Sequence, residues 1–151
     1  MDSDTAKNIL KMMYDGKLRK ITDKCILLPD KSLFNLDTHE IKVLDDKVGR
    51  ISGYDNMKFI HALQVRTSIL YDEYGNLIAR INECAKPKIY RISSYEYAII
   101  GKEYMYVYNY NIKAITKQIK HTNVFIDRTE RKISLAYIDN GVIRTIKLDI
   151  L

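Results

Sequence analysis

The chain has 151 residues, the length of one ordinary domain, and its hydrophobic fraction of 46% is sufficient for a single core. The 25 Lys and Arg residues outnumber the 19 Asp and Glu residues, and the resulting net charge of +6 favours acidic partners but is smaller than that of dedicated nucleic-acid binders. No apolar run approaches the roughly 20 residues of a membrane-spanning helix, and no basic segment followed by an apolar one opens the chain, so we expect one intracellular domain over residues 1–151 with no membrane partner.

Residues 3–14 are predicted to form a short helix. Ser3 or Asp4 can cap its start, apolar residues recur on one side, and Gly16 can close its end. From Ile21 onward, short apolar runs alternate with turn residues at intervals of about 8 to 12, as in antiparallel sheets. The predicted hairpins cover residues 33–44, 68–81, 95–110 and 134–146, and residues 45–62 are predicted to be an irregular connection. We therefore expect a mainly β antiparallel meander with a short N-terminal helix, built as a sandwich, a partly open barrel or a small propeller-like repeat.

Three segments resemble one another, each with an apolar strand, a polar turn and a tail that begins with Ile or Leu; they are residues 32–44, 68–81 and 103–115. The tails begin at Ile41, Leu77 and Ile112, which lie 36 and 35 residues apart. A near-constant period in a β chain is typical of stacked or radially repeated sheets. Ordinary hairpins of similar composition give the same pattern, so both interpretations remain open.

Alternating tyrosines are the strongest feature of the sequence. Tyr104, Tyr106, Tyr108 and Tyr110 stand at every second position, so an extended strand would place the four rings on one face. A two-residue loop at Gly101-Lys102 would pair this strand with the preceding segment, with positive φ at the glycine. That register sets Tyr97 opposite Tyr106 and Tyr95 opposite Tyr108, so that six tyrosines share a face.

This tyrosine face has two interpretations. Exposed rings can stack bases or anchor a protein interface, and Lys86, Lys88 and Arg91 can supply phosphate contacts. Alternatively, the rings stabilise the sheet through cross-strand pairs, and the opposite face provides the core. The apolar residues of that opposite face are Ala98, Ile100, Met105 and Val107.

Pro29-Asp30 followed by Glu40-Ile41-Lys42 resembles the PD-(D/E)xK signature of metal-dependent nucleases. The resemblance implies that Asp30 and Glu40 hold Mg²⁺ while Lys42 positions the attacking water. The match covers 14 residues, and Asp37-Thr38-His39 before Glu40 indicate a turn where the family has apolar strand residues. Mg²⁺ is the one cofactor that any motif implies, and no other metal or catalytic spacing occurs.

The cysteines and the carboxyl-terminal residues add two expectations. Cys25 and Cys84 form no CxxC motif, which indicates reduced thiols and a cytoplasmic location. The chain ends on an apolar strand segment, which favours pairing in its own sheet or self-association into a homo-oligomer. The abundance of Lys, Ile, Tyr and Asn is typical of AT-rich coding sequences, including those of low-GC bacteria and their viruses.

These observations favour a non-catalytic binding module whose tyrosine face contacts either another protein or nucleic acid. The nuclease and a structural, oligomer-forming protein are the alternatives. Salt dependence separates the two kinds of partner, because phosphate contacts weaken steeply as salt rises.

Overall fold

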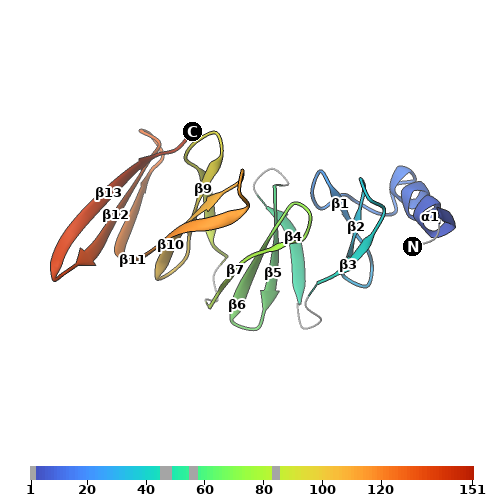
Figure 1. The fold of residues 1–151 in the computed structure, drawn as a ribbon, viewed down its shortest axis with the longest axis horizontal. Coiled ribbons are helices and arrows are strands. Elements are labelled where there is room, and N and C mark those ends of the chain that lie inside the picture. The colour runs from blue at the N-terminus through green and yellow to red at the C-terminus, as the bar shows by residue number, and fades with distance from the viewer. Residues whose placement is uncertain (1–2, 45–48, 55–57, 83–85) are drawn as a thin grey trace. The chain divides into compact units, whose positions relative to one another are not determined.

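A computed structural model describes residues 3–44, 49–54, 58–82 and 86–151. The chain divides into two compact units, residues 1–84 and 85–151, which we call the N-terminal unit and the C-terminal unit. The protein is mainly β, with 56% of the described residues in strands and 9% in helix, and its sheets are antiparallel, which confirms the predicted fold class (Figure 1). No helix in the described ranges has the length and apolar character needed to cross a membrane. The single domain expected over residues 1–151 stays a prediction.

The helix of the N-terminal unit, α1 (Ser3–Tyr14), confirms the predicted helix over residues 3–14. Its end is closed by Gly16, which has a φ of 76°. The N–H of Gly16 donates to the carbonyl oxygen of Met13 (3.0 Å), and that of Lys17 donates to Met12 (2.8 Å). These two hydrogen bonds form a Schellman motif, in which a glycine accepts the left-handed conformation at little cost.

Two sheets complete the N-terminal unit. The first has the order β1 (Cys25–Leu27), β2 (Ser32–Asn35) and β3 (Ile41–Val43). The second has the order β4 (Arg50–Tyr54), β5 (Phe59–Gln64), β6 (Thr67–Asp72) and β7 (Leu77–Ile81). Each strand pairs with the next along the chain, so both sheets are meanders.

The first sheet is covered on both faces. Side chains alternate along β1 and β2, so the pair Ile26 and Phe34 lies on one face while Cys25 and Leu33 lie on the other. Ile26 and Phe34 pack with α1, in a cluster of Ala6, Ile9, Leu18, Ile26 and Phe34. Figure 1 shows α1 beside this sheet. The other face packs on the second sheet, in a cluster of Ile21, Cys25, Leu33, Leu44, Ile60, Ala62, Ile69 and Tyr71. The N-terminal unit is thus a helix and two sheets in layers.

The prediction of an irregular connection over residues 45–62 is wrong where the structure describes it, because β4 and the start of β5 lie there. Residues 45–48 and 55–57 lie outside the described residues. Gly53 contributed to the wrong prediction, because a glycine inside a strand weakens the sequence pattern of that strand. In β4 it serves a close approach, because a Cβ atom at Gly53 would lie 2.4 Å from the carbonyl oxygen of Ile21.

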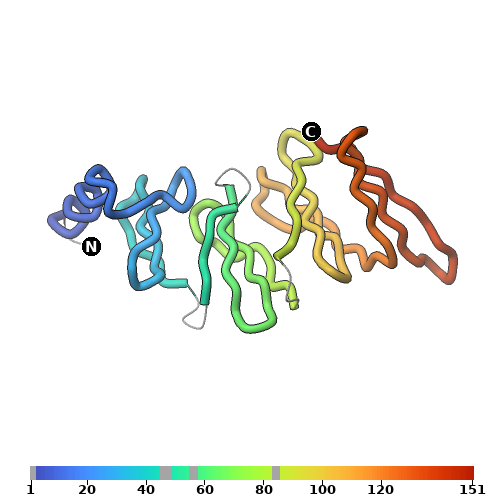
Figure 2. Tube along the Cα trace, turned by 180° about the vertical axis from the view of Figure 1, so that it is seen from behind, coloured from blue at the N-terminus to red at the C-terminus, as the bar shows by residue number. Residues whose placement is uncertain are grey.

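The C-terminal unit is one six-stranded meander. Its strands are β8 (Lys88–Arg91), β9 (Glu96–Ile100), β10 (Tyr104–Asn109), β11 (Ala114–Asp127), β12 (Lys132–Asp139) and β13 (Val142–Asp149). Figure 2 follows the chain through successive up-and-down hairpins, from yellow to red. The long strand β11 pairs with β10 along its first half and with β12 along its second half.

The sheet of the C-terminal unit curls around one core. The core cluster joins Ala98, Ile100, Met105 and Val107 of β9 and β10 to Ile133 and Leu135 of β12. The N–H of Leu151 donates to the carbonyl oxygen of Arg91 (2.9 Å), the last residue of the first strand, β8. The curvature therefore brings Leu151 back to the end of β8.

The hairpins β2–β3, β6–β7 and β10–β11 correspond to the three similar segments of the sequence. Their second strands begin at Ile41, Leu77 and Ala114. The third begins at Ala114 where Ile112 was expected, because the side chain of Asn109 accepts the N–H groups of Asn111 (2.9 Å) and Ile112 (3.3 Å) in the turn. Each hairpin lies in a separate sheet, so the sequence similarity corresponds to a repeated hairpin.

Candidate functional site

The tyrosine hairpin β9–β10 forms as predicted, but its register differs. The N–H of Gly101 donates to the carbonyl oxygen of Tyr104 (2.9 Å), so the loop residues are Lys102 and Glu103. Gly101 is absent from the glycines with positive φ, which rules out the predicted turn type. Tyr108 lies opposite Tyr97, and the predicted pairs of Tyr97 with Tyr106 and of Tyr95 with Tyr108 are wrong by two positions.

A shift of two positions keeps every side chain on its face. Tyr104, Tyr106 and Tyr108 therefore share a face with Tyr97, and Tyr110 donates its N–H to the carbonyl oxygen of Tyr95 (2.7 Å) just beyond the strand ends. We call the side of the hairpin that carries these six tyrosines the tyrosine face. The opposite face carries Ala98, Ile100, Met105 and Val107, which belong to the core of the C-terminal unit.

Exposure divides the six tyrosines into two groups. Tyr97 and Tyr108 are buried, with 7% and 1% of their surface exposed. Tyr95 is 41% exposed, and Tyr104, Tyr106 and Tyr110 are half-buried. Burial makes the first pair structural, so a partner can reach the other four, which we call the accessible tyrosines.

The register with β11 adds residues that sequence reasoning missed. Lys120 lies opposite Tyr104, and Gln118 lies opposite Tyr106. The rings of Tyr104 and Tyr106 are 6.1 Å apart between centroids, with 37° between their planes. A bulge between Val107 and Tyr108 sets this register, and no sequence signal specified it.

His121 holds the tip of the hairpin. Its backbone N–H donates to the carbonyl oxygen of Glu103 (2.9 Å), and its ring nitrogen Nε2 lies 2.9 Å from the carbonyl oxygen of Gly101. Both partners border the loop at Lys102 and Glu103. The imidazole thus stabilises the hairpin that presents Tyr104 and Tyr106.

The cations that were expected beside the tyrosines are divided between the two faces. Arg91 lies opposite Tyr97, but its guanidinium donates to the carbonyl oxygens of Ser93 (3.2 Å) and Ser94 (3.0 Å). Lys88 lies opposite Ile100, on the face away from the tyrosines. Lys86 precedes β8 and is exposed. The structure therefore places Arg91 on the tyrosine face and Lys88 on the other.

Charge is distributed unevenly between the two units. Residues 85–151 contain twelve Lys and Arg against six Asp and Glu, whereas residues 1–84 contain thirteen of each kind. The whole surplus of +6 therefore belongs to the C-terminal unit. A positive potential around this unit attracts acidic partners.

The nuclease-like residues are not brought together. Asp30 precedes β2 and accepts hydrogen bonds from the N–H and hydroxyl of Ser32, which lower the pKa of its carboxyl. Glu40 lies at the other end of β2, where its carbonyl oxygen accepts the N–H of Asn35 (2.9 Å). A four-residue strand separates its ends by roughly 10 Å. In the part of the chain that the structure describes, no three His, Cys, Asp or Glu residues are placed to hold a metal ion.

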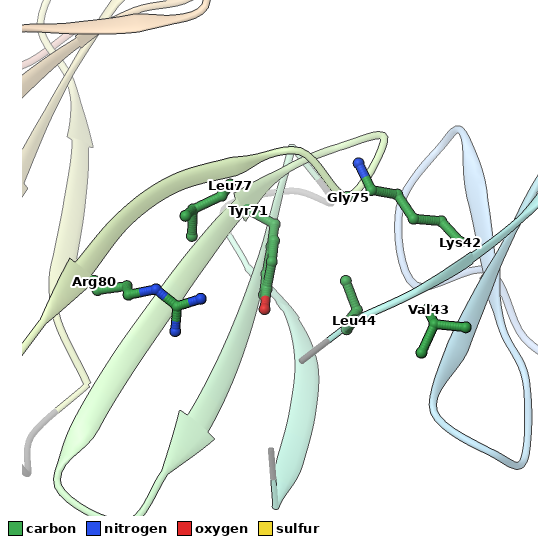
Figure 3. A pocket seen from close by; sticks show the side chains of 7 residues that line it. All are labelled: Lys42, Val43, Leu44, Tyr71, Gly75, Leu77 and Arg80. Atoms are coloured by element: carbon green, nitrogen blue, oxygen red, sulfur yellow. The ribbon is translucent and has the colours of Figure 1, made fainter. Parts of the chain in front are cut away.

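Lys42, the third residue of that motif, lines a pocket with Tyr71, Leu77 and Arg80 (Figure 3). The Nζ atom of Lys42 donates to Oδ1 of Asn76 (2.7 Å). This lysine is thus directed to the turn between β6 and β7, away from the positions of Asp30 and Glu40.

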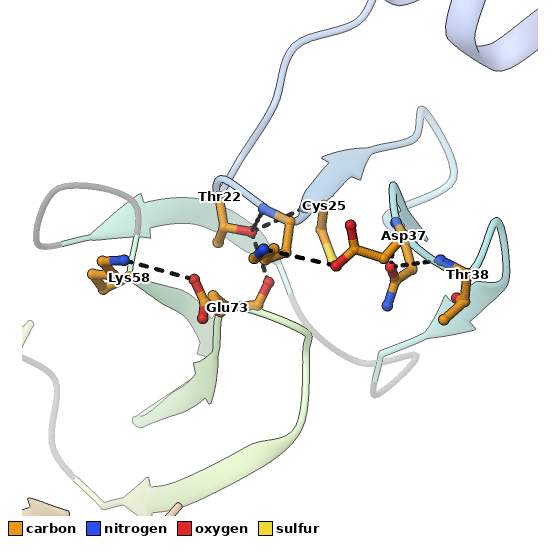
Figure 4. A network of polar contacts seen from close by, with 8 residues as sticks. Thr22, Cys25, Asp37, Thr38, Lys58 and Glu73 are labelled. Carbon is orange, nitrogen blue, oxygen red and sulfur yellow. Dashed lines mark hydrogen bonds and ion pairs between the residues drawn. The ribbon is translucent and has the colours of Figure 1, made fainter. Parts of the chain in front are cut away.

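A buried polar network surrounds Cys25 (Figure 4). The hydroxyl of Thr22 donates to the carbonyl oxygen of Glu73 (2.7 Å) and accepts the N–H of Cys25 (3.1 Å). Nζ of Lys58 lies 4.0 Å from the carboxylate of Glu73. Burial, with smaller contributions from the carboxylates of Asp72 and Glu73, raises the pKa of the Cys25 thiol to about 11. Cys25 is a free structural cysteine, and Cys84 lies outside the described residues.

No family model and no curated protein matches the chain. Among solved structures, it is similar to the AfRom2 CNH domain, with 14% identity, a TM-score of 0.31, and coverage of 84% of this chain and 47% of that one. Kluyveromyces lactis Hsv2 gives 14% identity, a TM-score of 0.35, and coverage of 82% and 42%. The WD40 domain of SCAP from fission yeast gives 8% identity, a TM-score of 0.35, and coverage of 86% and 44%. The chain thus spans less than half the length of these three, and likenesses at this level assign it neither a family nor a function.

Proposed function

We propose that the chain is a non-catalytic intracellular binding module that contacts a protein partner through its accessible tyrosines. The observation that carries this proposal is the division of the hairpin into a core face and a tyrosine face. Met105 and Val107 belong to the core of the C-terminal unit, on the opposite face of the same strand. The core therefore fixes the backbone that carries the tyrosine rings. Rigid tyrosines lose little conformational entropy on binding and are frequent anchors of protein interfaces.

The small number of cations beside the accessible tyrosines favours a protein partner over nucleic acid. Arg91 and Lys120 flank the tyrosines, and the guanidinium of Arg91 already donates to two carbonyl oxygens. The steep salt dependence of nucleic-acid binding is that of proteins that make roughly 6–10 phosphate contacts. Two cations are enough to orient an acidic protein surface, and aromatic rings then supply the apolar contact.

Site-specific photo-crosslinking in lysate of the source organism tests the proposal. A benzoylphenylalanine at position 104 is expected to crosslink a discrete protein. The matched control carries the same group at Tyr14, which is 81% exposed on α1 and far along the sequence from the hairpin. Capture by the tagged chain should be lost in Tyr104→Ala/Tyr106→Ala and retained in Tyr14→Ala.

Two results would contradict the proposal. Equal crosslinking from positions 104 and 14 would show that the tyrosine face is not selective. Binding of labelled single-stranded or duplex nucleic acid that falls steeply between about 50 and 200 mM salt, and is lost with the tyrosines, would assign the face to nucleic acid instead.

A further inference from the structure

Strand β13 has an edge that carries none of the usual protections against pairing. In the sheet order of the described residues it is a terminal strand (Figure 1), and it pairs with β12 over all eight of its residues without a bulge. Edge strands are commonly protected by short length, by a bulge or by proline. The residues of β13, Val142–Asp149, contain no proline. A long, regular strand is therefore available for pairing with another strand.

The hairpin with β12 determines which backbone groups face this edge. Asp139 and Val142 flank a two-residue loop, and such flanking residues exchange both of their backbone hydrogen bonds. The even-numbered residues of β13 therefore bond to β12. Consistent with this, the N–H of Ile150 donates to the carbonyl oxygen of Arg131 (2.8 Å). The odd-numbered residues direct their N–H and C=O groups to the open edge; they are Ile143, Thr145, Lys147 and Asp149.

The side chains beside this edge are exposed. Ile143 is 72% exposed and lies opposite Ile138 of β12, which is 60% exposed. Thr145 and Lys147 are exposed on the same face of the strand. A strand added at this edge would cover the apolar surface of Ile143.

Charge restricts how this edge can pair with a second copy of itself. In an antiparallel pair about a two-fold axis, the residues that face the open edge must lie opposite one another. An axis at Arg144 or at Lys147 sets that cation opposite its own copy, which destabilises the pair. An axis at Ile146 sets the carboxylate of Asp149 opposite Ile143. An axis nearer either end of β13 leaves few residues paired.

An axis at Thr145 avoids these conflicts. It sets Thr145 opposite its own copy, and threonine pairs of this kind stabilise antiparallel strands. Val142 then lies opposite Leu148, and Ile143 lies opposite Lys147, whose aliphatic stem can cover it. No two like charges lie opposite one another in this register. The strand is therefore complementary to itself.

We infer that β13 pairs antiparallel with β13 of a second copy of this chain, about a two-fold axis at Thr145. The pairing joins two six-stranded sheets into one continuous sheet. Residues 85–151 contain twelve Lys and Arg against six Asp and Glu, so two C-terminal units repel one another at long range. Salt screens this repulsion, and the dimer should therefore become tighter as the salt concentration rises.

Spin labels on single cysteines test the register. The background is Cys84→Ser, in which Cys25 is buried, and the labels are placed in Thr145→Cys, Lys147→Cys and Arg66→Cys. The two copies of Thr145 would lie about 5.5 Å apart between Cα atoms. The two copies of Lys147 would lie four residues apart along the strand, or roughly 13 Å. Dipolar broadening should be strongest at Thr145, weaker at Lys147 and absent at Arg66, an exposed residue between β5 and β6.

A charge exchange tests the same register by sedimentation equilibrium. Ile143→Lys sets two lysines opposite one another across the pair, so dimerisation should be about tenfold weaker. Adding Lys147→Glu converts each of these contacts into an ion pair and should restore dimerisation to within about threefold of the parent. Within one chain the two positions are four residues apart on β13, too far for contact. Rescue can therefore come only from the second copy.

Three results would overturn the inference. They are a monomer at all concentrations, broadening that is strongest at Lys147, and failure of Lys147→Glu to rescue Ile143→Lys. Dilution with unlabelled chain should remove the broadening, and circular dichroism should confirm that every variant is folded. Tyr104→Ala/Tyr106→Ala should leave the dimer unchanged, which separates this test from that of the tyrosine face.

Discussion

Tyr108 of β10 lies directly opposite Tyr97 of β9, and both side chains are buried on the face that points away from the core of their own unit. Cross-strand aromatic pairs contribute about 0.2–1 kcal/mol relative to a pair of alanines. The same face therefore combines a structural pair with accessible rings.

The two kinds of tyrosine should differ in stability measurements. Replacing a buried aromatic side chain by alanine costs about 3–5 kcal/mol, so Tyr108→Ala should lower the free energy of unfolding by that amount. Tyr95→Ala, at a 41% exposed site, should cost less than about 1 kcal/mol. Urea denaturation followed by circular dichroism measures both, and similar costs for the two variants would contradict the assignment.

Two glycines should respond differently to alanine. Gly16 has a φ of 76° with no atom within 4 Å of an added Cβ, so Gly16→Ala should cost about 1–2 kcal/mol from backbone strain alone. Gly53→Ala should cost more, because its Cβ would lie 2.4 Å from the carbonyl oxygen of Ile21 and the backbone would have to move. Thermal unfolding of the two variants checks this order, and the reverse order would show that β4 is not held against Ile21.

The Cys25 thiol should be unreactive in the folded protein and should make stability depend on pH. Burial raises its pKa from 9.0 to about 11, so the folded state disfavours the thiolate. The stability that the protonated Cys25 thiol contributes to the folded state is fully present below pH 9, where the thiol is protonated in both the folded and the unfolded chain. This stability is lost as the pH rises from about 9 to about 11.

Thiol labelling in a Cys84→Ser background measures this effect. At pH 8 the reagent should react slowly with the folded chain and rapidly in urea. The urea midpoint should fall less between pH 8 and pH 10 in Cys25→Ala than in the parent, which controls for other titrating groups. Rapid labelling of the folded chain would show that Cys25 is accessible.

The last strand should support self-association. β13 is a terminal strand of its sheet, and Ile143, which is 72% exposed, lies opposite Ile138, which is 60% exposed. Exposed apolar edge strands pair readily with other chains. We expect sedimentation equilibrium to show a concentration-dependent dimer that Ile143→Lys weakens and Val65→Lys, at a 90% exposed residue of the N-terminal unit, does not. A monomer at all concentrations would contradict this prediction.

The separation of Asp30 and Glu40 predicts no magnesium-dependent nuclease activity. The two carboxylates lie at opposite ends of β2, so one Mg²⁺ ion cannot contact both without rearrangement. Supercoiled and single-stranded DNA incubated with Mg²⁺ should remain as intact with the parent as with Asp30→Ala/Glu40→Ala. Cleavage by the parent that the double variant lacks would restore the nuclease interpretation.

Local sequence patterns were sufficient to predict an element where the residues of its turn or end are compatible with only one conformation. Helix 3–14 follows from its apolar spacing and Gly16, and in the predicted hairpin over residues 134–146 the pair Asn140-Gly141 forms the turn between β12 and β13. Asn140 and Gly141 have φ values of 49° and 77°, the left-handed pair that a type I′ turn requires. The alternation of the tyrosines likewise predicted their common face, because a period of two is independent of register.

Contacts between distant segments decided the rest. Gly101-Lys102 and Lys102-Glu103 are both acceptable two-residue loops, and in the fold His121, some twenty residues away, contacts the carbonyl oxygens of Gly101 and Glu103. The sequence also did not decide which face of the β9–β10 hairpin packs into the core, because both faces are apolar enough to be buried. Ile133 and Leu135 pack on Met105 and Val107 only once β11 has changed partner from β10 to β12. The sequence by itself determined the alternation of faces, and the curvature of the sheet determined which face became the core.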